Sequence, residues 1–193
     1  MATTTMRAPQ KENLWAFGTR EIVYSAIGAA LYGVLNWVFN NLQLPGTNLV
    51  SFRPPVAIPI FMGIVFGPLV GFFTGFFGNV LGDLLSGYGF YWHWDVGNGL
   101  MGMLPGLLPL VGISLARAQR SYLIASVTAI VTSLVSMAFP ALLINPFVMR
   151  EMDFAAAFAT LWLPAAVSNS VNGAILVPIL LAAWNAYRAR SGR

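Results

Sequence analysis

The sequence predicts an all-α, polytopic membrane protein, a bundle of six transmembrane helices with both termini in the cytoplasm. Its 193 residues are 58% hydrophobic, and the mean hydropathy is +0.73. Only 8% are charged, whereas soluble proteins carry about a quarter charged residues. The apolar residues also fall into runs that approach the length of about 20 residues needed to cross a bilayer. Membrane lipid is therefore the expected solvent.

The composition also excludes several classes of function. The chain has no cysteine, which rules out disulfides and thiolate metal sites. His93 is the only histidine, so no metal site is expected. The net charge of +4 is small and the basic residues lie at the ends of the apolar runs, so we expect no nucleic-acid partner. No catalytic or phosphate-cradling motif is present, and we expect neither a cofactor nor enzymatic activity.

Six segments form the expected membrane domain, residues 20–187, between a cytoplasmic tail at 1–19 and a basic cytoplasmic tail at 188–193. The first residues lack an apolar core followed by a cleavage site, so they are expected to form a tail and not a signal peptide. The expected spans are residues 20–43, 54–66, 68–86, 96–116, 121–144 and 156–187.

The second segment is short, and Gly67-Pro68 separates it from the third. Proline disfavours a helical residue before it and cannot donate its own amide. The sequence leaves two possibilities open here, a tight hairpin or one broken helix.

The orientation follows from the positions of lysine and arginine, which accumulate on the cytoplasmic side of membrane proteins. With six spans, only Arg53 and Arg150 fall on the outer side. The other eight fall on the inner side: Arg7, Lys11, Arg20, Arg117, Arg120, Arg188, Arg190 and Arg193. The connections 44–53, 87–95 and 145–155 are then outside, and they are longer than the inner ones.

The third segment carries glycines at helical spacing beside a polar pair. At about 100° per residue, Gly71, Gly75, Gly78 and Gly82 fall within an arc of about 60°. Small residues at this spacing predict close helix–helix packing. Asn79 and Asp83 lie one turn apart on a neighbouring arc. A lipid-facing carboxylate is costly, so Asp83 should face a cavity, or else lie at the interface as a cap or as a partner of Arg53.

The connection after the third segment is unusually aromatic. Tyr88, Phe90, Tyr91, Trp92 and Trp94 surround His93. Such a cluster is typical of an interfacial belt, but flat rings also stack on planar ligands. We favour a ligand-contacting loop, followed by a helix that Asp95 would cap.

Asparagine side chains, together with Asp83, supply a further argument for a pocket. In the expected topology they lie in the outer half of their helices or at mid-depth, whereas scattered interhelical contacts would show no such bias. Trp162 shares a helix face with the last two of them. The set is Asn36, Asn40, Asn79, Asp83, Asn98, Asn169 and Asn172.

Small residues also form a surface near the cytoplasmic end of the first segment. Ala26 and Ala30 belong to it and lie far from the polar cluster. Two interpretations stay open, packing within the bundle or docking of a partner's helix.

Together, these motifs resemble the substrate-binding S components of energy-coupling-factor (ECF) vitamin transporters, nearest the riboflavin branch. The resemblance covers about residues 20–187. It rests on six short helices with a basic inner side, Arg-Pro-Pro at 53–55, the glycine run from Gly67-Pro68 to Gly82-Asp83, and Ala26-x3-Ala30 low on the first helix.

The resemblance implies a subunit in a prokaryotic cell membrane that captures a vitamin-like small molecule at the outer face. It would deliver the molecule inward by docking, through Ala26 and Ala30, to a transmembrane T subunit driven by two cytoplasmic ATPase subunits. The implied pocket comprises Asn36, Asn40, Asn79, Asp83, Tyr91, Trp92, His93, Trp94, Asn98, Trp162, Asn169 and Asn172.

The lysine expected beside Asn169 in a riboflavin binder is missing, and Asp83 with His93 favours a cationic or amine-bearing ligand. The alternatives are a self-sufficient small transporter or channel, and an intramembrane enzyme.

Overall fold

The computed structural model describes residues 14–47, 50–113 and 121–191, and over these residues the chain is helical without a β-strand. The elements in chain order are α1 (Thr19–Asn40), η1 (Pro54–Val56), α2 (Ala57–Phe66), α3 (Pro68–Leu85), α4 (Trp92–Met103), η2 (Leu104–Val111), α5 (Ser121–Ala138), η3 (Phe139–Met149), α6 (Phe154–Ala157), η4 (Phe158–Trp162) and α7 (Leu163–Ser191).

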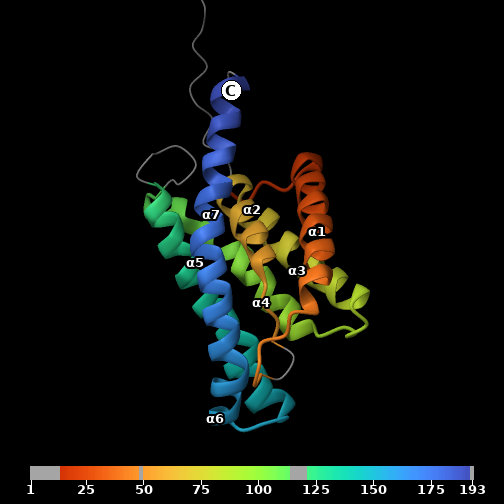
Figure 1. Cartoon of the computed structure of the whole chain (residues 1–193). Helices are drawn as coiled ribbons and strands as arrows, with labels where there is room; N and C mark the ends of the chain where they lie inside the picture. Colours follow the sequence, from red (N-terminus) through yellow and green to blue (C-terminus); the bar gives the residue numbers. More distant parts are fainter. Residues whose placement is uncertain (1–13, 48–49, 114–120, 192–193) are drawn as a thin grey trace, which may run out of the picture.

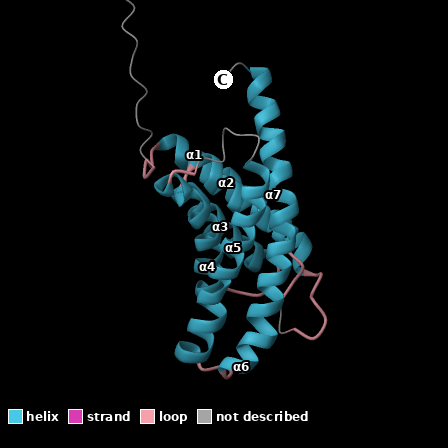
Figure 2. Cartoon of the chain, turned by 90° about the vertical axis from the view of Figure 1, so that its left-hand side faces the viewer, coloured by secondary structure: helices cyan, strands magenta, loops and turns pink. Residues whose placement is uncertain are grey.

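The helices form two groups that pack side by side. One group comprises α1 to α4, with α3 between α1 and α4. The other comprises α5 and α7, which run together along the length of the bundle (Figure 1). The Ser126 hydroxyl on α5 donates to the Ala174 carbonyl on α7 at 2.8 Å. At the end opposite the C-terminus, which we call the loop end, lie the α1–α2 and α3–α4 connections and α6 (Figures 1 and 2).

Four helical stretches are long and apolar enough to cross a membrane, namely Thr19–Asn40, Pro68–Leu85, Tyr122–Met149 and Phe154–Ser191; Pro54–Phe66 is apolar but shorter. Large apolar side chains on these helices, such as Ile27, Leu31 and Val171, are exposed, as a lipid-facing surface requires. A multi-pass membrane protein follows. Six spans and cytoplasmic termini stay predictions, and Arg7, Lys11, Arg117, Arg120 and Arg193 lie outside the described residues.

A tight hairpin joins α2 to α3. Gly67 has a φ of +104°, which favours glycine, and Pro68 begins α3 at the position where its missing amide costs least. Gly63 and Gly71 lie four residues to either side and face one another across the hairpin. Of the two possibilities left open by Gly67-Pro68, the structure shows the hairpin.

The four glycines of α3 pack against two different helices. Gly71 and Gly75 lie against the backbone of α4, at Gly102 and Asn98. Gly78 and Gly82 lie instead against α1, where Tyr32 and Asn36 face them. Because there is no room for a Cβ atom at these positions, α3 approaches both neighbours closely. This packing presents the polar side of α3 to the interior.

The helices at the expected fourth and fifth segments differ most in form from the expectation. The α4 helix begins at Trp92, so Trp92 to Asp95 form its first turn and Tyr91, not Asp95, is the N-cap residue. The fifth segment changes from α-helix to the wider π-helix at Phe139. Pro140 and Pro146 lie within η3 and cannot donate a backbone hydrogen bond, which disrupts the α-helical pattern.

Candidate functional site

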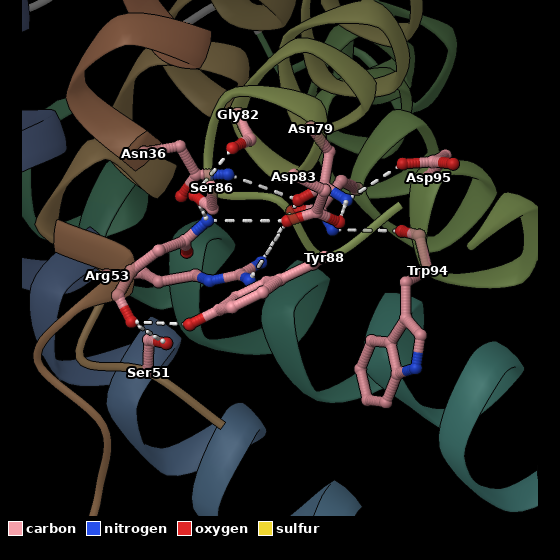
Figure 3. Close-up of polar contacts among 12 residues, drawn as sticks. Asn36, Ser51, Arg53, Asn79, Gly82, Asp83, Ser86, Tyr88, Trp94 and Asp95 are labelled. Atoms are coloured by element: carbon pink, nitrogen blue, oxygen red, sulfur yellow. Dashed lines mark hydrogen bonds and ion pairs between the residues drawn. The ribbon is translucent and has the colours of Figure 1, made fainter. Parts of the chain in front are cut away.

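A buried polar network lies between α1, α3 and α4, and Asn79 is its centre. Asn79 is fully buried, and its Nδ2 donates to Asp83 Oδ2 at 2.9 Å and to Asp95 Oδ1 at 2.8 Å. Its Oδ1 accepts from Asn36 Nδ2 at 3.2 Å and from Arg53 Nη1 at 3.0 Å. One amide group thus joins three segments of the chain (Figure 3).

Asp83 is compensated by a cation and by amides. Arg53 Nη2 lies 3.7 Å from Asp83 Oδ1, and the two side chains are only 16% and 6% exposed. Asn40 Nδ2 lies 3.4 Å from the same oxygen and 2.9 Å from Ser86 Oγ. A buried carboxylate needs both charge pairing and hydrogen bonds, and Asp83 has both. The structure therefore shows the pairing with Arg53 that the sequence offered as one alternative, and Asp83 also lines the cavity described below.

The α1–α2 connection folds back on itself and so brings Arg53 to this network. Phe52 N donates to Leu42 O at 2.8 Å, and Leu44 N donates to Val50 O at 2.8 Å. Ser51 Oγ donates to the Asn40 carbonyl at the end of α1. The guanidinium of Arg53 is thereby directed toward Asp83 (Figure 3).

A glycine-dependent turn places Tyr88 on the other side of Asp83. Gly87 has a φ of +74°, and Tyr88 N donates to the Asp83 carbonyl at 2.9 Å while Gly87 N donates to Leu84 O at 3.1 Å. This is the Schellman arrangement that commonly ends a helix at glycine. The Tyr88 hydroxyl then donates to the Asn40 carbonyl at 3.0 Å. The end of α3 and the end of α1 are fixed together.

A cavity of about 230 Å³ lies beside this network, between the two groups of helices. Its first wall comes from the α1–α2 connection, α3 and the start of α4. This wall is both charged and aromatic: Ser51, Arg53, Asp83, Tyr88, His93 and Trp94.

The second wall comes from α5, η3, the loop before α6, η4 and α7. Met137, Leu161 and Ala165 make it apolar, and Asn169 adds an amide. Asn145, Glu151 and Met152 complete it near the loop end. A cavity that combines apolar side chains with fixed polar groups is typical of a small-molecule site.

A left-handed residue positions the polar corner of the second wall. Arg150, which ends η3, has a φ of +57° and donates its amide to the Asn145 carbonyl at 2.8 Å. The reversal brings Glu151 back over η3, where its Oε2 accepts from Asn145 Nδ2 at 2.8 Å. Non-glycine residues adopt this conformation uncommonly, and here the hydrogen bond from Arg150 to Asn145 stabilises it.

The predicted pocket residues occupy three kinds of position. Those that line the cavity are Asp83, Tyr91, His93, Trp94 and Asn169. Those in the network behind its first wall are Asn36, Asn40 and Asn79. The remaining four residues, Trp92, Asn98, Trp162 and Asn172, are not among the lining residues.

Each of these four residues has local contacts of its own. Asn98 accepts from Tyr32 Oη at 2.6 Å and donates to the Trp94 carbonyl. Asn172 donates to the Ser168 carbonyl of its own helix, and Trp162 Nε1 donates to Leu134 O. Trp92 is partly exposed, and its ring packs edge-on against Phe139.

Sequence reasoning missed much of the second wall. Asn145, Glu151 and Met152 belong to a connection that was recognised as an outer loop, but nothing in the pattern linked it to Asp83. Arg53 was considered as a partner of Asp83 and as part of the Arg-Pro-Pro motif, but not as a residue of the pocket. One signal could have identified Arg53 as a pocket residue. In the expected topology, Arg53 and Arg150 are the two basic residues on the outer side, apart from the other eight.

Ala26 lies in the first half of α1 and Ala30 at its middle; both are exposed, and neither lines the cavity. The side of α1 that faces the bundle consists of other residues, including Ser25, Gly28 and Ala29. The two alanines therefore do not serve as internal packing residues. Within the described part of the chain, no three histidine, aspartate or glutamate side chains are grouped in a way that could hold a metal ion.

Comparison with known proteins agrees with the resemblance seen in the motifs. A family model described as "ECF-type riboflavin transporter, S component" matches residues 16–187. The match includes every described residue of the polar network and of the cavity.

Curated relatives match over a shorter region. A UPF0397 protein of Vibrio atlanticus is 36% identical over 98 residues, which are 49% of this chain and 51% of that protein. A UPF0397 protein of Streptococcus pneumoniae is 29% identical over 91 residues, 47% of this chain and 48% of that protein. The chain thus spans about half the length of the curated relatives it matches. No solved structure matches.

Proposed function

The chain belongs to the family of ECF-type riboflavin transporter S components, and on that premise we propose that it binds a vitamin-like small molecule in the cavity at its loop end. The family is one of transporter components and not of enzymes. The loop end faces the outside of a prokaryotic cell. The bound molecule is then delivered inward after the chain docks to a T subunit and its two ATPase subunits.

One observation carries this proposal: a cavity of about 230 Å³ that is backed by a charged, hydrogen-bonded network inside an otherwise apolar bundle. Burying a carboxylate and a guanidinium in a membrane protein is expensive, and such residues usually mark a functional site. Here Arg53 and Asp83 both reach the cavity wall. Binding a polar molecule there explains why the bundle maintains them.

Docking is assigned to the exposed small-residue face of α1. A helix that approaches another closely in a membrane needs small side chains at the contact. Ala26 and Ala30 provide such a contact one turn apart, between the start and the middle of α1 and outside the cavity lining. Binding and docking are thereby separated along the same bundle.

Ligand co-purification tests the binding function. We expect mass spectrometry of the gently extracted protein to find a bound heterocyclic molecule. Adding that molecule to ligand-free protein should quench tryptophan fluorescence, because Trp94 lines the cavity, and Trp94→Phe should remove most of the quenching. If nothing co-purifies and no vitamin from a broad panel changes the fluorescence, the proposed function is wrong.

A further inference from the structure

Of the eleven buried side-chain polar atoms that have no hydrogen-bond partner among the described residues, three belong to residues that line the cavity. They are Arg53 Nε, His93 Nδ1 and Asn145 Oδ1. His93 and Asn145 are each only 3% exposed. Buried polar groups are nearly always paired, so three such atoms around one cavity indicate where a bound molecule makes its hydrogen bonds.

The chemistry of two of these atoms is fixed. Arg53 Nε can only donate. Asn145 Nδ2 donates to the Glu151 carboxylate at 2.8 Å, and a carboxylate cannot donate in return, so the free Asn145 atom is the accepting Oδ1. Arg53 belongs to the first wall and Asn145 to the second. A molecule that joins the walls needs an acceptor at one end and an N–H or O–H donor at the other.

The charges around the cavity favour the same orientation of the ligand, with its hydrogen-bond donor at the Asn145 side. Asp83 is already neutralised by Arg53. Glu151, beside Asn145, has no cation within ion-pair distance in the described part of the chain. The Asn145 corner is therefore negative and attracts a donor-rich or singly positive group, while an anionic group would be repelled.

The size and walls of the cavity limit the rest of the molecule. Pockets for drug-sized ligands have volumes of about 300–1,000 Å³, and this cavity has about 230 Å³. Tyr88, Tyr91 and Trp94 line one side, where they offer faces and edges to a flat ring.

From these observations we propose that the cavity takes a compact amino-substituted heteroaromatic ring, smaller than a three-ring flavin. A ring nitrogen or carbonyl accepts from Arg53 Nε, and the amino group donates to Asn145 Oδ1 and Glu151. This assignment rests on the proposed binding function and specifies its substrate class.

Paired probes test the assignment on the full chain in lipid nanodiscs by titration calorimetry. One pair is 4-amino-2-methylpyrimidine and 2,4-dimethylpyrimidine, and the other is adenine and purine. Within each pair the amino group is the main difference. Riboflavin serves as the three-ring comparison. We expect the amino member of at least one pair to bind about tenfold or more tighter, as a hydrogen bond to a charged acceptor predicts.

Variants locate the amino group. Glu151→Gln keeps an acceptor for Asn145 but removes the charge, and it should weaken the amino probe while leaving its partner unchanged. Asn145→Leu should abolish the difference within the pair. Asp153→Asn is the matched control, because it removes one negative charge two residues from Glu151, outside the cavity lining, and asparagine can still cap α6.

The outcomes separate the two claims. If riboflavin binds more tightly than every amino probe, or if both members of each pair bind equally, the substrate class is wrong and the binding function stands. The class is also wrong if a co-purified molecule lacks an amino-bearing ring. If no probe binds and nothing co-purifies, the binding function itself fails. An amino-bearing heterocycle found by co-purification supports both claims.

Discussion

Asn79 shows, at the scale of a single residue, how the site is held together. Its amide is both donor and acceptor, and it contacts Asn36, Arg53, Asp83 and Asp95. Because the fully buried side chain donates two hydrogen bonds and accepts two, all of its bonding capacity is met by protein groups. Through these bonds Asn79 connects Asp83 to α1, to the α1–α2 connection and to α4. The shape of the first cavity wall therefore depends on Asn79.

Arg53→Met should destabilise the protein by about 3–5 kcal/mol, because it leaves the buried Asp83 carboxylate without its cation. Thermal unfolding in nanodiscs measures the effect. Combining it with Asp83→Asn should restore part of the loss, since the pair is then removed together.

Arg20→Met is the matched control for this prediction. Arg20 Nε also lies 3.7 Å from a carboxylate, that of Glu21, but its side chain is 73% exposed. An exposed pair contributes about 1 kcal/mol or less. Equal losses in Arg53→Met and Arg20→Met would show that burial of the Arg53–Asp83 pair has no energetic consequence.

At this scale the sequence predicts part of the site. The depth of Asn36, Asn79 and Asp83 along their helices places them together, as the structure shows. The same reasoning does not separate Asn172 from them. An asparagine on a helix can satisfy itself with the carbonyl four residues earlier, as Asn172 does with Ser168, and periodicity cannot distinguish that bond from a contact to a ligand.

Among the elements, α3 is the one around which the first group packs. Its glycines divide between two neighbours, with Gly71 and Gly75 on α4 and Gly78 and Gly82 on α1. The pattern of glycines predicts close packing but not the identity of each partner. That division depends on the hairpin at Gly67. The sequence leaves open whether the chain forms a hairpin or one broken helix at this point.

Gly75→Ala should destabilise the bundle by about 1–3 kcal/mol or more, because its methyl group would meet the backbone of Asn98, which cannot move aside. Gly173→Ala is the control. Its methyl group would lie 3.0 Å from the Ala129 side chain, where a small shift suffices. Thermal unfolding of both variants checks this, and comparable stability would contradict the packing described for α3.

Ala26→Leu with Ala30→Leu should abolish ATP-dependent uptake while leaving ligand affinity unchanged, because the pair lies on α1 away from the cavity. Ala182→Leu with Ala186→Leu is a matched control, since these alanines are also exposed and one turn apart, but on α7. Full uptake by the α1 variant would show that docking occurs elsewhere.

Helix boundaries could be predicted from the sequence where a glycine or proline interrupts the helix. They could not be predicted where contacts with other parts of the fold determine the end of the helix. Gly67-Pro68 marks the end of α2 correctly. The start of α4 was placed too late, because Asp95 accepts from Asn79 instead of capping the helix. The π-helical stretches were not anticipated, since apolar periodicity does not distinguish them from α-helix.

For the whole molecule, the important feature is that the cavity lies between the α1–α4 group and the group that contains α5 and α7. Its two walls are far apart in sequence, with Arg53 and Asp83 on one and Asn145 and Asn169 on the other. Composition predicts a bundle of membrane helices. No local sequence pattern predicts which connections lie opposite one another around the cavity. The second wall was missed for this reason.

The expected topology can be tested with single cysteines, because the chain has none of its own. In intact cells, a membrane-impermeant maleimide should label Asp153→Cys, at the loop end, and should not label Ser191→Cys until the cells are opened. The reverse pattern would invert the orientation and place the cavity on the cytoplasmic side.

Uptake into proteoliposomes tests the central claim most directly, with the ligand that co-purifies as the transported molecule. The chain alone should bind this ligand but not accumulate it. Together with a T subunit and two ATPases it should accumulate the ligand when ATP is supplied, and Ala26→Leu with Ala30→Leu should prevent this. Accumulation by the chain alone, independent of ATP, would contradict a binding subunit and indicate a self-sufficient transporter.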